Sequence, residues 1–289
     1  MVDAKYKQPA GIKPARLAVR VATAAVYALV VLLAIWFNEI PGLSGYGPLL
    51  LAMVMSVFAG FSATEFYALE RRESRLPNET FGVAAAVLMP IFASVWGLSG
   101  LSAVVTALIA ASLVWHVVFV RVRTTDTATT VFGAVYTGFL LAYLVLIVRD
   151  FTFGRDLALA VVLGVWANDS LAYLIGSTLG RHKMMPRISP KKSWEGFIAG
   201  ALGTLVVWVG LALFFPNVGV SLPLAIATGI VVGASVVIGD LFESRMKREA
   251  GVKDSGKALP GHGGFLDRLD SLILVGLLAY WILHWGGVK

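Results

Sequence analysis

The sequence has no cysteine among its 289 residues. This absence excludes a disulfide framework, a thiolate metal site and a cysteine nucleophile. Charge is also scarce, with 14% charged residues against 58% hydrophobic ones. Soluble domains average about 25% charged and about 45–50% apolar residues. Together with repeated apolar runs of about 20 residues, this composition excludes an ordinary soluble domain and indicates a helical membrane protein with several spans.

Apolar segments recur along the whole chain. Nine can be drawn, each near the roughly 20 residues that a membrane-crossing helix needs. They cover 17–38, 47–69, 81–97, 100–120, 129–148, 157–179, 195–215, 222–244 and 269–286. The first is too long for the core of a signal peptide, and no small-residue cleavage site follows it. We therefore predict an all-α, polytopic membrane protein with about nine transmembrane helices, the first of them uncleaved.

The distribution of Lys and Arg predicts how this bundle is oriented. If the N-terminus is inside, the inner segments are 1–20, 70–80, 121–128, 180–195 and 244–268. They hold 21 basic residues, whereas the outer segments hold only Arg149, Arg155 and Lys289. Cytoplasmic loops carry such an excess, so we expect a cytoplasmic N-terminus. We also expect two parts, 1–160 and 161–289, of which the second carries the two most basic loops.

The polar stretch between the last two spans, residues 244–270, is rich in charge and glycine. At its start Asp240, Glu243, Ser244 and Lys247 follow one another at i, i+3, i+4 and i+7, so they share a helix face. A helix end emerging into water explains Lys247 equally well. It explains Asp240 less well, because that residue lies one turn deeper and a buried carboxylate needs a partner.

Carboxylates from both ends of this stretch could meet on a divalent metal ion. Asp267 and Asp270 lie at the start of the last span, where helix N-capping explains one of them. All ligands would be oxygens, with only His262 nearby, which favours Mg²⁺ over zinc. Gly263 and Gly264 allow positive φ and a close approach of the backbone to a ligand. A loop that leads into a helix N-terminus can also direct N–H groups at a phosphate.

Two further polar segments are candidates. In the sixth span, hydrogen bonding between helices explains Asn168 and Ser170 about as well as function does, whereas Asp169 is by default functional. The segment 189–196, SPKKSWEG, predicts a Ser/Lys turn that leads into a helix and could hold a polyphosphate. Its glycine spacing is not that of a P-loop.

Four other residues are interpreted more simply. Glu65 is expected to pair with a base or to bind a polar part of a lipid. For His116 a hydrogen-bonded packing role is favoured over catalysis, and Gly196 and Gly200 are expected to allow close helix packing.

The polar segments resemble the motifs of a known family. Residues 244–270 carry Ser-x-Met-Lys-Arg, then Lys253-Asp254, Gly256, Leu259-Pro260 and HGGFLDRLD from His262 to Asp270. This pattern resembles, position by position, the signature of the phosphatidate cytidylyltransferase (CDP-diacylglycerol synthase) family. Asn168-Asp169-Ser170-x-Ala172-Tyr173 and residues 189–196 also resemble motifs of that family. The likeness covers roughly residues 165–275, and residues 1–160 resemble the family only as a set of spans.

The resemblance implies an activity: CTP + phosphatidate → CDP-diacylglycerol + diphosphate, in phospholipid biosynthesis. It implies Mg²⁺, a second cation K⁺, a homodimer, and a multi-pass enzyme of the plasma membrane whose active site faces the cytoplasm. CTP, phosphatidate and membrane lipid are the expected partners, and nucleic acid is not. A CTP-dependent polyprenol or lipid kinase and an ion-coupled transporter are the alternative functions.

The resemblance and the residue types also assign roles. By the resemblance, Asp240 and Asp267 are the metal ligands. Residues expected to act in catalysis are Lys247, Arg248, Lys253, Asp254, His262 and Asp270. Residues expected to contact substrate are Asn168, Asp169, Tyr173, Ser189, Lys191, Lys192, Ser193, Ser244, Gly263, Gly264 and Arg268. Residues 1–160 are expected to serve lipid access and dimer contacts, and 161–289 to carry catalysis.

Overall fold

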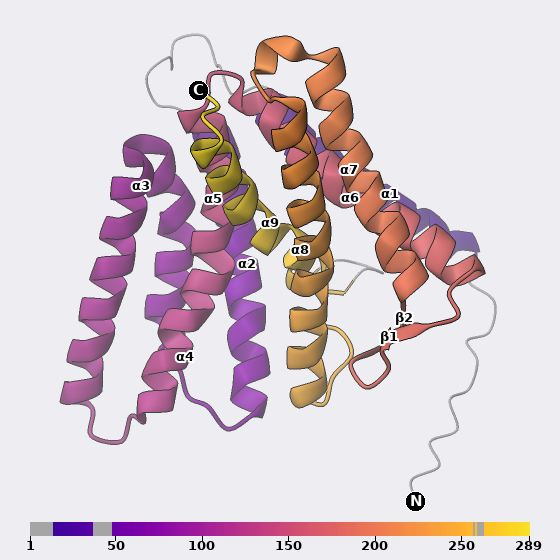
Figure 1. Ribbon diagram of the computed structural model, residues 1–289. Helices are drawn as coiled ribbons and strands as arrows, with labels where there is room; N and C mark the ends of the chain where they lie inside the picture. Colours follow the sequence, from indigo (N-terminus) through magenta and orange to yellow (C-terminus); the bar gives the residue numbers. More distant parts are fainter. Residues whose placement is uncertain (1–13, 37–47, 257, 259–262) are drawn as a thin grey trace, which may run out of the picture.

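The computed structural model describes residues 14–36, 48–256, 258 and 263–289, and the fold is helical (Figure 1). The helices are α1 (Pro14–Trp36), α2 (Leu49–Arg72), α3 (Glu79–Val118), α4 (Thr124–Ala134), α5 (Leu140–Asp150), α6 (Gly154–Thr178), α7 (Trp194–Phe214), α8 (Leu222–Glu249) and α9 (Leu266–Trp285). A π-helical turn, η1 (Val135–Phe139), joins α4 to α5, and a 3-10 turn, η2 (Pro216–Val218), lies between α7 and α8.

The described helices fit a membrane protein, as predicted. Six of them, α2, α3, the rod from α4 through η1 to α5, α6, α7 and α8, are long and apolar enough to cross a bilayer. Large apolar side chains also cover their outer surfaces; Val206 and Phe214 of α7, for example, are 70% and 79% exposed. In water this surface would be unfavourable, whereas in lipid it is the expected exterior.

The long helix α3 contains the tight hairpin predicted between the third and fourth spans. The chain reverses at Gly97, which has φ 62° and ψ −145°. Such a conformation is open to glycine and costly for other residues. The guanidinium of Arg149, whose Nε donates to the Ser94 carbonyl at 3.1 Å, lies where a side chain at 97 would begin. The two limbs of α3 stand side by side in Figure 1.

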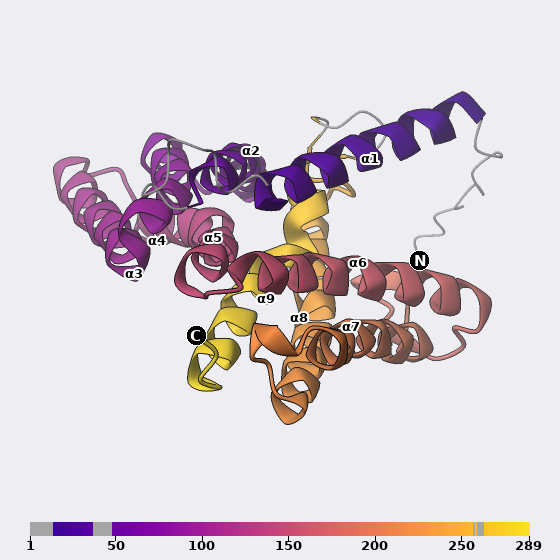
Figure 2. The ribbon, with the colours of Figure 1, turned by 90° about the horizontal axis from the view of Figure 1, so that it is seen from above.

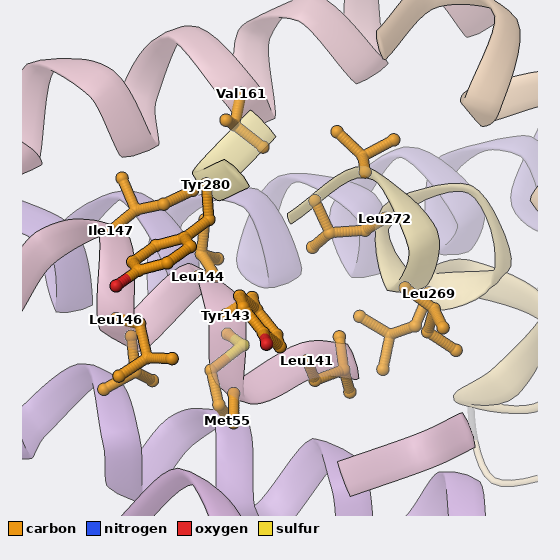
Figure 3. Close-up of a cluster of buried hydrophobic side chains, with 14 of the residues drawn as sticks. Met55, Leu141, Tyr143, Leu144, Leu146, Ile147, Val161, Leu269, Leu272 and Tyr280 are labelled. Carbon is orange, nitrogen blue, oxygen red and sulfur yellow. The ribbon is translucent and has the colours of Figure 1, made fainter. Parts of the chain in front are cut away.

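Helix α9 joins the two halves of the chain. It packs against α8 and α5 and also touches α2 and α6 (Figure 2). Around it the core is apolar, with buried side chains such as Met55 of α2, Leu144 of α5 and Leu272 of α9 (Figure 3). At the far end of α9 the Tyr280 hydroxyl donates to Asp150 Oδ2 at 2.9 Å. Helices from both halves of the sequence therefore hold α9, including its N-terminal end, which we call its head.

One small β-hairpin departs from the all-α prediction. Strands β1 (Lys183–Met185) and β2 (Ser189–Ser193) pair antiparallel, with Lys183 opposite Ser193. The segment predicted as a turn before α7 is thus an extended strand. The pairing satisfies backbone groups that a free turn would leave to water, and the Trp194 N–H continues it by donating to the His182 carbonyl at 2.9 Å.

The hairpin and the carboxyl ends of α2, α3 and α8 lie toward one end of the bundle, the lower end in Figure 1, whereas the turn within α3 and the C-terminus lie toward the other. The described basic loops therefore lie toward the same end of the bundle.

Candidate functional site

The site begins where α8 crosses α9. Gly239 faces the backbone of α9, and a Cβ there would overlap the carbonyl oxygen of Asp270. The missing side chain lets the two helices approach closely at this point. Asp240 and Asp270 consequently interact electrostatically, and Asp169 of α6 interacts with both. Acidic groups from three helices thus gather at one place.

A buried lysine connects two of the neighbouring carboxylates. Lys247 is 9% exposed and its Nζ lies 2.6 Å from Asp267 Oδ1. The same ammonium group forms an ion pair with Glu243, one helical turn earlier and 0% exposed. This contact confirms the predicted shared face of α8. Buried charges are costly unless they are paired, so the three groups form one structural unit.

The second oxygen of Asp267 holds the loop between α8 and α9. It accepts hydrogen bonds from Ser255 N at 2.9 Å, Ser255 Oγ at 3.0 Å and Gly264 N at 2.8 Å. Gly263 has φ +90°, which confirms the predicted positive φ for this glycine, whereas Gly264 does not have a positive φ. The backbone thereby closes on the Asp267 carboxylate.

Glu65 of α2 has a different role from the one expected. Its carboxylate accepts hydrogen bonds from Phe265 N at 3.1 Å and Leu266 N at 2.9 Å, and it lies 3.0 Å from Ser255 Oγ, whose one proton it shares with Asp267. Among the described residues its partners are these backbone and hydroxyl donors, and no basic side chain is one of them. A helix N-terminus carries unpaired N–H groups and a partial positive charge, and both favour a carboxylate there. His116, as favoured, is hydrogen-bonded, with Nδ1 3.0 Å from Thr127 Oγ1.

The hairpin brings a second lysine to the site. Lys192 Nζ lies 2.7 Å from Asp240 Oδ2, and Ser244 Oγ donates to Asp240 Oδ1 at 3.1 Å. Arg248 fixes the hairpin in this position, since its guanidinium donates to the carbonyl of Ile188 at 3.3 Å and to that of Val252 at 3.2 Å. The two basic loops, which Arg248 and Ile188 join across 60 residues of sequence, therefore converge on one face of α8.

A cavity opens beside this cluster. It has a volume of about 270 Å³ and lies between α1, α6 and α9. Its walls are largely apolar, from Tyr27, Val31, Trp166 and Leu272, and its charged lining comes from Asp169 and Arg268. Asp169 interacts electrostatically with Arg268, which also lines the cavity, and with Lys192 of the site. The charged part of the cavity wall therefore lies next to the site. Its shape and lining suit a molecule with an apolar part and an anionic part.

Two of the predicted site residues, Asn168 and Ser193, have structural partners. Asn168 is fully buried and its amide donates to Thr204 Oγ1 and to the Gly233 carbonyl, both at 3.1 Å, which ties α6 to α7 and α8. Ser193 caps α7 by accepting from Gly196 N at 3.2 Å. Gly196 and Gly200 face the backbone of α6, which confirms the close helix packing expected of them.

Other predicted site residues are exposed or half-buried, or lie outside the described residues. Lys191, Lys253, Asp254 and Tyr173 are exposed, and Ser189 is half-buried in β2. His262 lies outside the described residues, as do the neighbouring Pro260 and Gly261.

Two residues near the site were not selected from the sequence. Ser255 connects Glu65 to Asp267, and Tyr136 lies in the π-helical turn η1. The Tyr136 hydroxyl is buried, has no hydrogen-bond partner within the described part of the chain, and interacts electrostatically with the Asp240–Asp270 cluster. A lone Tyr in an apolar span gave no signal, but π-turns often occur at functional sites.

The carboxylate oxygens of the site are of the type that binds Mg²⁺. Asp240 and Asp267 offer hard oxygen ligands, and Mg²⁺ is commonly bound by one or two carboxylates together with substrate phosphates. In the structure an ammonium group, from Lys192 or Lys247, lies where a cation would meet each carboxylate. No group of three or more His, Cys, Asp or Glu residues is placed to hold a metal within the described residues. The chain would therefore need substrate oxygens to complete the coordination.

The sequence model of the cytidylyltransferase family matches residues 18–285, which include every element of this site. The chain belongs to the cytidylyltransferase family. The match extends over the N-terminal helices, including Glu65, which the motifs alone did not cover.

Three curated relatives are named phosphatidate cytidylyltransferase. The chain is 44% identical over 151 residues to the phosphatidate cytidylyltransferase of Thermotoga maritima, an alignment that covers 50% of this chain and 55% of the relative. It is 44% identical over 122 residues to that of Staphylococcus haemolyticus, covering 42% and 46%. It is 45% identical over 139 residues to phosphatidate cytidylyltransferase 5, chloroplastic, of Arabidopsis thaliana, covering 47% and 34%. The chain spans about half or less of the length of these relatives.

Proposed function

We propose that this chain is a phosphatidate cytidylyltransferase that makes CDP-diacylglycerol and diphosphate from CTP and phosphatidate. The observation that carries the proposal is the pairing of Lys192 with Asp240 and of Lys247 with Asp267 at the head of α9. A site with alternating ammonium and carboxylate groups can accept phosphates on the former and a metal on the latter. The names of the relatives support the same reaction.

The reaction needs positioning more than a strong base. A phosphatidate oxygen, already anionic at neutral pH, attacks the α-phosphorus of CTP. A new P–O bond forms to the lipid phosphate, and the bond from the α-phosphorus to the bridging oxygen breaks, which releases diphosphate. The main barrier is the approach of two anions, and such transfers are catalysed by orientation and charge neutralisation.

The chain's own residues meet these needs. Lys192 and Lys247 would bind phosphate oxygens when Asp240 and Asp267 turn to the metal. The hairpin that Arg248 anchors would hold the triphosphate in line. When bound by Asp240 and Asp267, Mg²⁺ would supply positive charge that stabilises the leaving diphosphate. K⁺ as a second cation stays a prediction from the resemblance.

The lipid would reach the site from the bilayer. The cavity between α1, α6 and α9 has apolar walls for acyl chains and the charged pair Asp169–Arg268 near the acidic cluster. We further propose nine crossings, a cytoplasmic N-terminus, a site that opens to the cytoplasm, and a homodimer in the plasma membrane. The gathering of basic loops at one end of the bundle supports this orientation.

A detergent assay tests the function. Purified protein with CTP, phosphatidate and Mg²⁺ should form CDP-diacylglycerol, and Asp267→Asn should reduce the rate at least about 100-fold, since it weakens both the Lys247 pair and metal ligation. Asp150→Asn is the matched control, because Asp150 binds Tyr280 and Arg149 at the opposite end of the bundle. Absence of product from the wild type under all metal conditions would refute the proposal.

A further inference from the structure

Glu65 is a buried carboxylate that the reaction outlined above does not use. It is 8% exposed and lies on α2, yet its acceptors are all satisfied by the loop before α9 and the first residue of α9. The contacts join positions up to 201 residues apart in the sequence. Because its hydrogen-bond donors all come from one short segment, this carboxylate stabilises the position of that segment.

The surrounding backbone is shaped around this carboxylate. A Cβ at Gly256 or at Gly264 would overlap the Glu65 carboxylate oxygens. Both glycines therefore let the loop fold tightly over Glu65. The Phe265 and Leu266 N–H groups that it accepts belong to the N-terminus of α9, where orphan donors need a partner. Glu65 thus supplies from α2 a cap that α9 lacks in its own sequence.

Ser255 links this cap to the site. Its Oγ lies 3.0 Å from Glu65 Oε2 and 3.0 Å from Asp267 Oδ2. A hydroxyl has one proton, so it can donate to only one of the two carboxylates at a time. When the proton goes to Glu65, the Asp267 oxygen retains a lone pair for another partner. The position and availability of Asp267 therefore depend on Glu65.

We propose that Glu65 is a positioning residue: by holding Ser255 and the head of α9 it sets the Asp267 carboxylate and its Lys247 partner for phosphate and metal. The expected effect on kcat rests on the proposed function. The contacts of the loop themselves do not depend on that function. The N-terminal part of the chain would then contribute to the catalytic site as well as to lipid access.

Glu65→Gln tests the proposal. The amide keeps the shape but replaces one acceptor by a donor, which must face either Ser255 or a backbone N–H. We expect kcat for CDP-diacylglycerol formation to fall at least about tenfold, as loss of a hydrogen bond to a charged group predicts, with a smaller change in KM for CTP. In protein without substrates, hydrogen exchange of the Phe265 and Leu266 amides should rise at least about tenfold.

Glu70→Gln is the matched control. Glu70 is a buried carboxylate on the same helix that pairs with Arg75 and makes no described contact with the 255–266 loop. It should leave kcat and the exchange of the α9 amides near wild-type values. If both variants behaved alike, Glu65 would have only a general structural role and the proposal would be overturned.

Ser255→Ala provides a second test if Glu65→Gln does not fold. It removes the shared hydroxyl without placing a donor against a donor, and it should lower kcat about threefold or more. In the double variant the fold reduction in kcat should be smaller than the product of the two single reductions, because both residues act through one interaction. Independent, multiplying effects would contradict the proposal.

The two proposals can fail separately. If the wild type makes no CDP-diacylglycerol but Glu65→Gln still raises exchange at Phe265 and Leu266, the function is wrong and the positioning stands. If the wild type is active and Glu65→Gln matches it in both kcat and exchange, the positioning is wrong and the function stands.

Discussion

At the scale of single residues, four carboxylates of the site have defined partners among the described residues. Asp240, Glu243 and Asp267 face ammonium groups, whereas Glu65 faces N–H and O–H donors. Helix spacing was enough to predict that Asp240, Glu243 and Lys247 share a face. It could not predict the partners of Glu65, because a contact across 190 residues leaves no local pattern.

Lys247→Met should both destabilise the protein and abolish activity. The substitution leaves Glu243 buried without its cation, and removal of one partner from a buried ion pair costs about 3 kcal/mol or more. Thermal unfolding in detergent measures this loss. Adding Glu243→Gln removes the unpaired charge, so the double variant should regain much of the stability while remaining inactive. Recovery of activity together with stability would show that Lys247 has no role in the chemistry.

Asn168→Ala separates packing from substrate binding. Asn168 donates to Thr204 and Gly233, so the variant should lose about 1–2 kcal/mol of stability. The KM for CTP should change less than about twofold, because the side chain is enclosed by three helices. A large rise in KM without loss of stability would instead support the substrate contact expected from the motif.

At the scale of elements, apolar run lengths predicted the helices well, and the hairpin within α3 lies where the third and fourth spans meet. The β-hairpin and the π-helical turn were not predicted. The strand β2 depends on pairing with β1, and its Ser-Pro-Lys-Lys-Ser sequence has no strand pattern of its own. The π-turn η1 depends on tertiary packing, since Val135–Phe139 reads as ordinary helix. Both lie next to the site.

The crossing of α8 and α9 should be sensitive to one methyl group. Gly239→Ala places a Cβ against the Asp270 carbonyl, and such overpacking costs about 1–3 kcal/mol. We expect at least about a tenfold loss of turnover, because Asp240 moves away from Asp270. Gly210→Ala is the control, since its nearest neighbour, Phe214 Cδ2, is 4.0 Å away. Equal activity of the two variants would contradict a close crossing at the site.

At the scale of the whole molecule, composition and charge predicted a membrane bundle with its basic loops on one side. Which loops meet was predictable only in part. The motifs indicated that the 189–196 and 244–270 segments form one site, and the Lys192–Asp240 pair joins them. The N-terminal helices carry no motif, so the contribution of α2 to the site could be found only from the structure.

The natural absence of cysteine allows a direct test of orientation. Single variants Glu73→Cys and Asn217→Cys place a thiol in an exposed loop at each end of the bundle. A membrane-impermeant maleimide added to intact cells should label position 217 and leave position 73 unlabelled until the membrane is opened. Labelling of position 73 from outside, or of both positions, would contradict the proposed topology.

The central claim is that this site transfers a cytidylyl group to phosphatidate. The most direct measurement uses two preparations of CTP, one labelled at the α-phosphate and one at the γ-phosphate. We expect the α-label to enter the lipid together with cytidine and the γ-label to leave as diphosphate. Transfer of the γ-label to lipid, with release of CDP, would identify a kinase and contradict the account.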